Sequence, residues 1–367
     1  MKNAVATIRI AFLLLLYVNG QAQSDSLTEK EQVFRDSIAK VNLSSKVNSE
    51  SQEAYNKGIE LYRSGRFKEA IQSYNKALSN NPEFADAFYN KGIAELELGN
   101  YDDAIKSFSE VLALDKERKQ AYIKKIEAHS EKGDYETAIK ELGDLIAKFP
   151  DIAEAYYKLG DLYFLQSRYE DAILEFNKAI ELKSDYAYAW NDRGSCYRQL
   201  EQYEQAISDY TQAGKIDPSL AFVFNNIGST YRKMKDYNHA IAAYNNAMRA
   251  NPKFFLAYCN RGSILFDQKR YREALDDFNK AIELNNKYAP AYNNRGTVRY
   301  KLEQFNQAVK DFDTAIQYDP DYASAYLNRG IAREMSRDPE GACSDWQKAA
   351  DLGLEEGRQY LINDCNN

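Results

Sequence analysis

The sequence predicts an all-α protein, a solenoid of nine helix–turn–helix units that ends in a C-terminal capping helix. Three observations predict it: a period of 34 residues, small residues at fixed positions of that period, and no insertion that interrupts the period. The chain has 367 residues, more than a single ordinary core usually holds. An architecture that lengthens by stacking units is therefore favoured.

Glycine marks one position of the period, which we call the glycine slot. Alanine stands twelve residues after every slot, from Ala70 to Ala342, and an aromatic residue stands nine residues after it in eight of the nine units. Small side chains let two helices approach closely, and we expect these aromatic rings, with those four residues before the slot, to fill the gaps between units. The slot residues are Gly58, Gly92, Ile126, Gly160, Gly194, Gly228, Gly262, Gly296 and Gly330.

This pattern resembles the tetratricopeptide repeat over residues 51–352, and the resemblance implies a right-handed superhelix of hairpins, each made of a helix A and a helix B. It also implies that the A helices line an inner groove that binds peptides or partner helices. A chaperone-binding subclass of this family clamps a terminal carboxylate with a lysine before, and an asparagine after, the slot of its first unit. The first unit here has Tyr55 and no such asparagine, so that mode is disfavoured.

The N-terminus has the layout of a secretory signal peptide over residues 1–20. Lys2 and Arg9 precede the apolar run Ile10–Val18, which is too short to span a bilayer, and a small or polar stretch follows. Cleavage before Gln21 or after Ala22 is expected; the alternative is a buried N-terminal helix. We therefore expect an exported protein, periplasmic or secreted, that does not span a membrane once the signal is removed. Residues 21–50 are interpreted as a polar linker that is partly helical.

Residues 353–367 are predicted to form the capping helix and tail. Folding this segment back brings Cys365 near Cys343, and an exported protein favours a disulfide between them, with two free thiols as the alternative. Cys196 and Cys259 lie almost two units apart, so both are expected to be unpaired.

Candidate binding residues lie on the predicted A helices. Asparagine recurs two residues before the slot, and we call Asn90, Asn226, Asn260, Asn294 and Asn328 the amide ladder. Each amide offers a donor and an acceptor that match a peptide backbone, although such asparagines can equally bond neighbouring helices. The groove also contains Tyr55, Tyr89 and Tyr157 in its N-terminal half, and Arg198 and Arg232 in its C-terminal half. One half suits apolar or basic segments and the other polar or acidic ones; variation on a solvated face is the alternative.

Composition and motifs disfavour other classes of function. A formal net charge of −7 disfavours unaided binding to nucleic acid. The chain has only two histidines, and its four cysteines show no C-x-x-C spacing, so no metal site is predicted. No phosphate loop, nucleophile elbow or H-E-x-x-H motif occurs, so neither catalysis nor a cofactor is predicted. The predicted function is a non-catalytic scaffold or adaptor that binds partner proteins or peptides. The alternatives are a periplasmic holdase-type chaperone and, least favoured, an enzyme with an unrecognised site in the groove.

Overall fold

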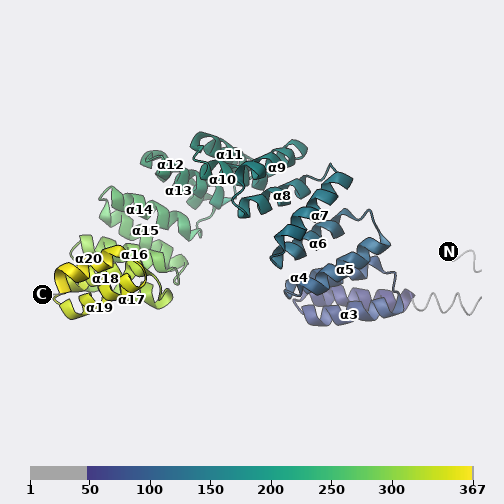
Figure 1. Cartoon of the computed structure of the whole chain (residues 1–367), viewed down its shortest axis with the longest axis horizontal. Coiled ribbons are helices and arrows are strands. Elements are labelled where there is room, and N and C mark those ends of the chain that lie inside the picture. Colours follow the sequence, from purple (N-terminus) through teal and green to yellow (C-terminus); the bar gives the residue numbers. More distant parts are fainter. Residues whose placement is uncertain (1–47, 366–367) are drawn as a thin grey trace, which may run out of the picture. The chain divides into compact units, whose positions relative to one another are not determined.

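The computed structural model describes residues 48–365, and every regular element among them is a helix (Figure 1). Short A helices alternate with B helices along this part of the chain. The A helices cover residues 48–63, α4 (Ala85–Glu97), α6 (Lys119–Glu131), α8 (Ala153–Leu165), α10 (Ala187–Gln199), α12 (Ala221–Lys233), α14 (Phe255–Asp267), α16 (Ala289–Lys301) and α18 (Ala323–Met335). The B helices are α3 (Phe67–Asn80), α5 (Tyr101–Leu114), α7 (Tyr135–Lys148), α9 (Tyr169–Leu182), α11 (Tyr203–Ile216), α13 (Tyr237–Ala250), α15 (Tyr271–Leu284), α17 (Phe305–Tyr318) and α19 (Pro339–Asp351). The predicted all-α repeat solenoid is confirmed.

The predicted signal peptide and most of the predicted linker lie outside the described residues. Residues 48–50 of that linker already belong to the first helix. Among residues 48–365, none of the helices has both the length and the apolar composition that crossing a membrane requires.

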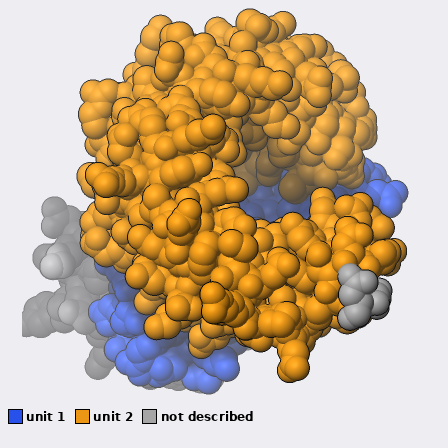
Figure 2. All heavy atoms as spheres, turned by 90° about the vertical axis from the view of Figure 1, so that its left-hand side faces the viewer, with its two compact units in different colours: residues 1–141 blue, residues 142–367 orange. Residues whose placement is uncertain are grey.

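The chain divides into two compact units, which Figure 2 shows in different colours; the first ends at Glu141 and the second begins at Leu142. Within each unit, helices that are consecutive in sequence pack together, α3 on α4 and α4 on α5, for example. In the second unit the successive A helices α8, α10, α12, α14, α16 and α18 also contact one another. These A helices therefore form one continuous face, which we call the A-helix face.

The turn from helix A to helix B requires a left-handed backbone. Gly65, Gly99 and Gly133 supply it in the first three hairpins with φ between 72° and 84°. In the six later hairpins a non-glycine residue adopts φ between 59° and 66°, as Lys235 does at 63°. The amide of Lys235 bonds the Arg232 carbonyl and the next amide, of Asp236, bonds the Tyr231 carbonyl, which ends the helix in a Schellman motif.

The core of each hairpin is a ring packed against the glycine slot. A Cβ added to Gly228 would lie 2.6 Å from the ring of Tyr244, sixteen residues further along the chain. The same position holds a fully buried ring in eight hairpins: Tyr74, Phe108, Phe176, Tyr210, Tyr244, Phe278, Phe312 and Trp346. The rings predicted to be core, nine residues after the slot, are only partly buried, and Tyr135 is 40% exposed. These rings still pack against helix A: Tyr169 lies 5.5 Å from the ring of Phe164, and three other hairpins have the same contact. Their predicted packing between helices is therefore confirmed, at partly buried positions.

The third hairpin departs from this pairing at both positions. Ile126 stands in the glycine slot and Leu142, sixteen residues later, stands where the other hairpins have a ring; both are buried.

Buried ion pairs fasten the hairpins of the second unit. The guanidinium of Arg193 donates to both carboxylate oxygens of Asp209 at 2.7 Å and also to Asn177 of the preceding hairpin. Equivalent pairs join Arg261 to Asp277, Arg295 to Asp311 and Arg329 to Asp345. The carboxylates are at most 6% exposed, so each needs its arginine to offset the loss of solvent. In the sixth hairpin Ile227 stands at the position of the arginine and Ala243 at the position of the aspartate, so this hairpin has neither member of the ion pair.

The C-terminal segment packs on the last hairpin as α20 (Glu355–Tyr360) and the π-helix η1 (Leu361–Cys365). Tyr360 stacks on the buried Trp346 with ring centroids 4.7 Å apart. The structure places Cys343 and Cys365 as a bonded pair with Cα atoms 5.8 Å apart, and Cys196 and Cys259 are buried and free, as predicted. The disulfide in the protein itself stays a prediction.

Candidate peptide-binding face

The amide ladder connects each A helix with the one before it. In the second unit, Nδ2 of Asn226 donates to Oδ1 of Asn191 at 3.0 Å, and Nδ2 of Asn260 donates to Oδ1 of Asn225 at 2.9 Å. Asn328 repeats this bond with Asn293 at 3.0 Å. At Asn294 the acceptor is the sulfur of Cys259, and the distance is 3.9 Å. One N–H of each ladder asparagine therefore bonds a neighbouring helix, the alternative that the sequence left open.

The rest of the ladder amides stays available. Within the described residues, the side-chain oxygens of Asn226, Asn260 and Asn328 have no hydrogen-bond partner, and each of these amides has a second N–H. All three side chains are partly exposed. Each retains one donor and one acceptor for a ligand on the A-helix face.

In the first unit the predicted tyrosines are packed rather than open. Asn90 donates to the hydroxyl of Tyr55 at 2.8 Å, and the Tyr55 ring lies 4.7 Å from that of Phe84. The guanidinium of Arg118 lies 4.5 Å from the ring centroid of Tyr89. These contacts leave the two rings only partly exposed, so the A helices of the first unit offer less free apolar surface than their composition indicates.

Tyr157 belongs to a polar network in the second unit. Its hydroxyl donates to Asp192 at 2.7 Å, and Asn191 donates to the other carboxylate oxygen at 2.8 Å. Burial raises the pKa of Asp192 although both hydrogen bonds oppose the rise, and the nearby Asp161 adds to it. Burial also raises the pKa of the Tyr157 phenol, with a further contribution from the Asp192 carboxylate. This arrangement holds α8 to α10 and does not offer the tyrosine hydroxyl to a ligand.

Arg198 and Arg232 occupy the same position of α10 and α12, four residues after the slot. The guanidinium of Arg232 lies 4.0 Å from the Asp267 carboxylate, and Arg198 has no ion pair within the described residues. A serine of each of these helices pairs with a phenol of the following helix B: Ser195 with Tyr210 of α11 at 3.1 Å, and Ser229 with Tyr244 of α13 at 3.3 Å. The sequence analysis did not identify the two phenols.

The sequence analysis also missed a pair of rings on the first turns of the same two helices. Tyr188 of α10 and Phe222 of α12 stack with centroids 6.0 Å apart, and Tyr188 is 48% exposed. Both stand six residues before the slot, where the next two units have Leu256 and Pro290. Aligning the units and reading that column would have found this apolar edge.

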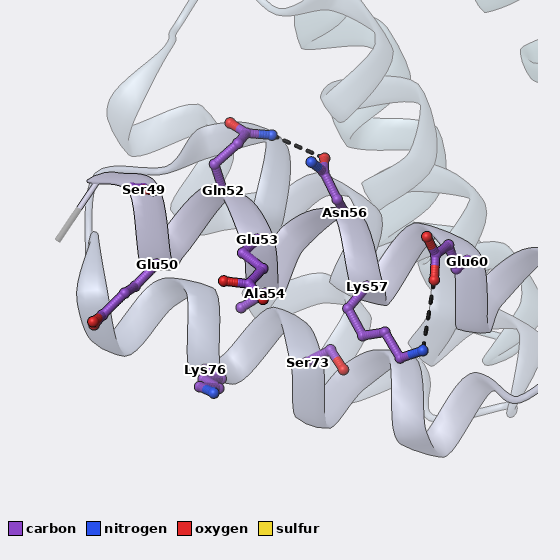
Figure 3. Close-up of a pocket in the computed structure, with 10 residues that line it drawn as sticks. All are labelled: Ser49, Glu50, Gln52, Glu53, Ala54, Asn56, Lys57, Glu60, Ser73 and Lys76. Carbon is purple, nitrogen blue, oxygen red and sulfur yellow. Dashed lines mark hydrogen bonds and ion pairs between the residues drawn. The ribbon is translucent and has the colours of Figure 1, made fainter. Parts of the chain in front are cut away.

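A hollow of about 1070 Å³ lies on the first hairpin, lined by the helix over residues 48–63 and by α3 (Figure 3). Gln52 donates to Asn56 at 3.0 Å, and Lys57 pairs with Glu60 at 3.5 Å. The lining is polar and its charges are of both signs. Such a surface suits the outer end of a stack of repeats, which needs a polar face toward solvent.

Histidines and potential metal ligands are dispersed in the described part of the chain, which contains no group of three or more His, Cys, Asp or Glu side chains arranged to hold a metal ion. Nδ1 of His129 lies 3.2 Å from Asp134, and Nδ1 of His239 lies 2.7 Å from Asp236 near the start of α13. Each histidine pairs with an acid of its own hairpin.

Comparison with known families identifies the repeat. Tetratricopeptide repeat families match residues 55–118, 123–187, 187–220 and 255–288, and a further TPR repeat family matches residues 228–268 and 296–335. Together these segments cover well over half of the chain. Among curated proteins no significant match is found.

Solved structures share the fold. A tetratricopeptide repeat protein from Parabacteroides merdae is 20% identical with a TM-score of 0.53, and the match covers 67% of this chain and 99% of that one. PilF of Pseudomonas aeruginosa is 22% identical with a TM-score of 0.51, over 57% of this chain and 96% of that one. A chain of the APC/C heterotetramer Cut9–Hcn1 is 15% identical with a TM-score of 0.52, and the match covers 84% of this chain and 76% of that one.

Proposed function

Because this chain belongs to the tetratricopeptide repeat family, we propose that it is a non-catalytic scaffold or adaptor that binds peptide segments or helices of partner proteins on its A-helix face. Members of this family bind other proteins or peptides. The observation that carries the proposal is the amide ladder, whose asparagines keep one donor and one acceptor free after bonding the neighbouring helix. An extended peptide backbone presents the complementary groups at every residue.

The proposal includes export to the periplasm or out of the cell. It is supported by the signal-like residues 1–20 and by the pairing of Cys343 with Cys365, which an oxidising compartment would stabilise. Expression of the full-length chain in a Gram-negative host tests it. We expect the protein in the periplasm or medium, with Gln21 or Gln23 as its first residue and with two thiols, rather than four, that react after denaturation. An unprocessed N-terminus in the cytosol would contradict export.

Affinity capture from envelope and secreted fractions tests partner binding. The bait is the processed protein, compared with an Asn226→Asp, Asn260→Asp double variant. Aspartate keeps the size of the side chain and its acceptor oxygens but removes both amide donors. Partners that bind through the ladder should be lost or reduced, as measured by quantitative mass spectrometry.

A matched control separates lost binding from lost packing. Asn245→Asp and Asn279→Asp change asparagines of helices α13 and α15, which bond arginines of the next hairpin outside the A-helix face. This control should keep the captured partners. Equal capture by all three proteins would exclude the ladder as the site. Suppression of the aggregation of unrelated unfolded proteins, with no defined partner captured, would instead support the holdase alternative.

A further inference from the structure

Two consecutive hairpins, α10–α11 and α12–α13, share three polar residues that no other repeat combines. Each has serine one residue after the slot, arginine four after it and tyrosine sixteen after it. We call these residues the arginine–hydroxyl cluster: Ser195, Arg198, Tyr210, Ser229, Arg232 and Tyr244.

Packing alone does not require the hydroxyls of this cluster. Phe278 and Phe312 fill the position of Tyr210 and Tyr244 in the next two hairpins, and all four rings are buried to the same degree. In the cluster each phenol reaches the serine of its own A helix, at 3.1 Å from Ser195 and 3.3 Å from Ser229. The phenols therefore join helix B to the serines of helix A inside each hairpin, and they leave the guanidiniums as the exposed donors of the cluster.

The two guanidiniums of the cluster differ from those of the arginines one residue before the slot. Those at Arg193, Arg261 and Arg295 each bond a buried aspartate through two nitrogens. Arg198 is partly buried yet has no ion pair within the described residues, and Arg232 lies no closer than 4.0 Å to its one acid, Asp267. A partly desolvated guanidinium gains most from an anion that accepts its hydrogen bonds.

Both arginines act on the same phenol. Burial raises the pKa of Tyr244, while the hydrogen bond from Ser229 and the charges of Arg232 and Arg198 offset part of that rise. Lys233 follows Arg232 on the same helix, while the carboxylates of Asp192 and Asp267 lie near Tyr210 and Arg232, respectively.

An apolar edge lies across the face from the two guanidiniums. Tyr188 and Phe222 stack on the first turns of α10 and α12, ten residues before the arginines. At a helical rise of 1.5 Å per residue the two features are about 15 Å apart. An extended peptide covers that distance in about four to five residues.

We propose that the arginine–hydroxyl cluster binds a carboxylate of an extended acidic peptide segment whose apolar side chain lies on Tyr188 and Phe222. The inference rests on the proposed function and names the chemistry of the partner segment. The two guanidiniums donate to the carboxylate, and the ring pair buries the apolar side chain.

Short fluorescein-labelled peptides on a Gly-Ser background test the inference by fluorescence anisotropy with the full-length processed protein. One peptide has a pair of leucines and a pair of glutamates with about four residues between them. In matched peptides lysines replace the glutamates or serines replace the leucines. The leucine–glutamate peptide should bind most tightly, and its affinity should fall as the salt concentration rises.

Variants assign the binding to the cluster. Arg198→Gln with Arg232→Gln should weaken the leucine–glutamate peptide by roughly tenfold or more, the loss expected for charge-assisted hydrogen bonds, and leave the lysine peptide unchanged. Tyr210→Phe with Tyr244→Phe copies the later hairpins and keeps the core, and it should leave the affinity for the same peptide nearly unchanged because both phenols are buried. Lys215→Gln removes a positive charge from helix B of the same hairpin pair and should have no effect.

Three results would overturn the carboxylate site: equal binding of the glutamate and lysine peptides, no effect of the arginine variant, or no binding by any peptide. Inorganic phosphate and acetate are also compared as competitors at the same concentration. If phosphate displaces the peptide and acetate does not, the cluster binds phosphate and the carboxylate site is overturned. The proposed function is judged separately. Partners captured equally by the arginine variant would refute this site and keep the scaffold, whereas failure to capture any partner would refute the scaffold.

Discussion

Replacing Gly228 by alanine tests the pairing of the glycine slot with the buried ring. A Cβ at this position would lie 2.6, 2.8 and 2.9 Å from three atoms of the Tyr244 ring, which is fully buried and cannot swing away. Overpacking of this kind costs about 3 kcal/mol at the upper end of its usual range, and the helix propensity of alanine returns about 1 kcal/mol. We expect a net loss of about 2 kcal/mol and a melting temperature lower by about 4–8 °C.

Gly143→Ala is the matched control for this experiment. Gly143 lies inside α7, and a Cβ there meets no atom within 4 Å. The substitution should therefore stabilise the protein by about 1 kcal/mol through helix propensity alone. Melting curves followed by circular dichroism measure both variants. A Gly228→Ala protein as stable as Gly143→Ala would refute the steric argument.

A double variant tests the same pairing from the other side. The third hairpin replaces both positions together, with Ile126 in the slot and Leu142 in place of the ring. Combining Gly228→Ala with Tyr244→Leu should therefore cost less than the sum of the two single changes, with a coupling energy of about 1–2 kcal/mol. Strict additivity would show that the slot and the ring do not constrain each other.

Three further changes test the other structural conclusions. Lys235→Gly removes the left-handed strain of a non-glycine turn and should raise the free energy of unfolding by about 1 kcal/mol; an unchanged or lower urea midpoint would contradict it. Arg261→Ile should lower the free energy of unfolding by about 3 kcal/mol because Asp277 stays buried without its partner. Adding Asp277→Ala gives the pair of residue types found in the sixth hairpin and should restore most of this free energy, as measured by the same urea titration. Asp192→Asn removes a carboxyl group whose pKa is raised by burial, so the folded protein binds the proton of this carboxyl more tightly than the unfolded chain does. The ionised carboxylate therefore destabilises the fold above the raised pKa, and this destabilisation disappears as the pH falls towards the unfolded value of about 3.9. The variant should melt higher than the wild type at pH 8, with a smaller difference at pH 4; an equal difference at both would refute the role of the charge.

The sequence was sufficient to predict the hairpins, their register and the helices that carry the candidate binding residues. A solenoid repeats one local structure, so small and aromatic residues recur at a constant spacing and can be recognised without knowledge of any long-range contact. The same register placed Asn226, Asn260, Arg198 and Arg232 on the A helices, where the structure has them.

What each of these side chains contacts was decided by the tertiary structure, because a residue's partner in a solenoid lies on another helix or in another repeat. Spacing alone could not show that Asn226 uses one N–H to bond Asn191, since solvent and a peptide were equally available acceptors. Nor could spacing show that the guanidinium of Arg193 forms an ion pair with Asp209. The guanidinium of Arg198, five residues later on the same helix, forms no ion pair within the described residues. The direction of a side chain from its helix, and the burial that removes water as a competing partner, separate a residue that fastens the repeats from one that can bind a ligand.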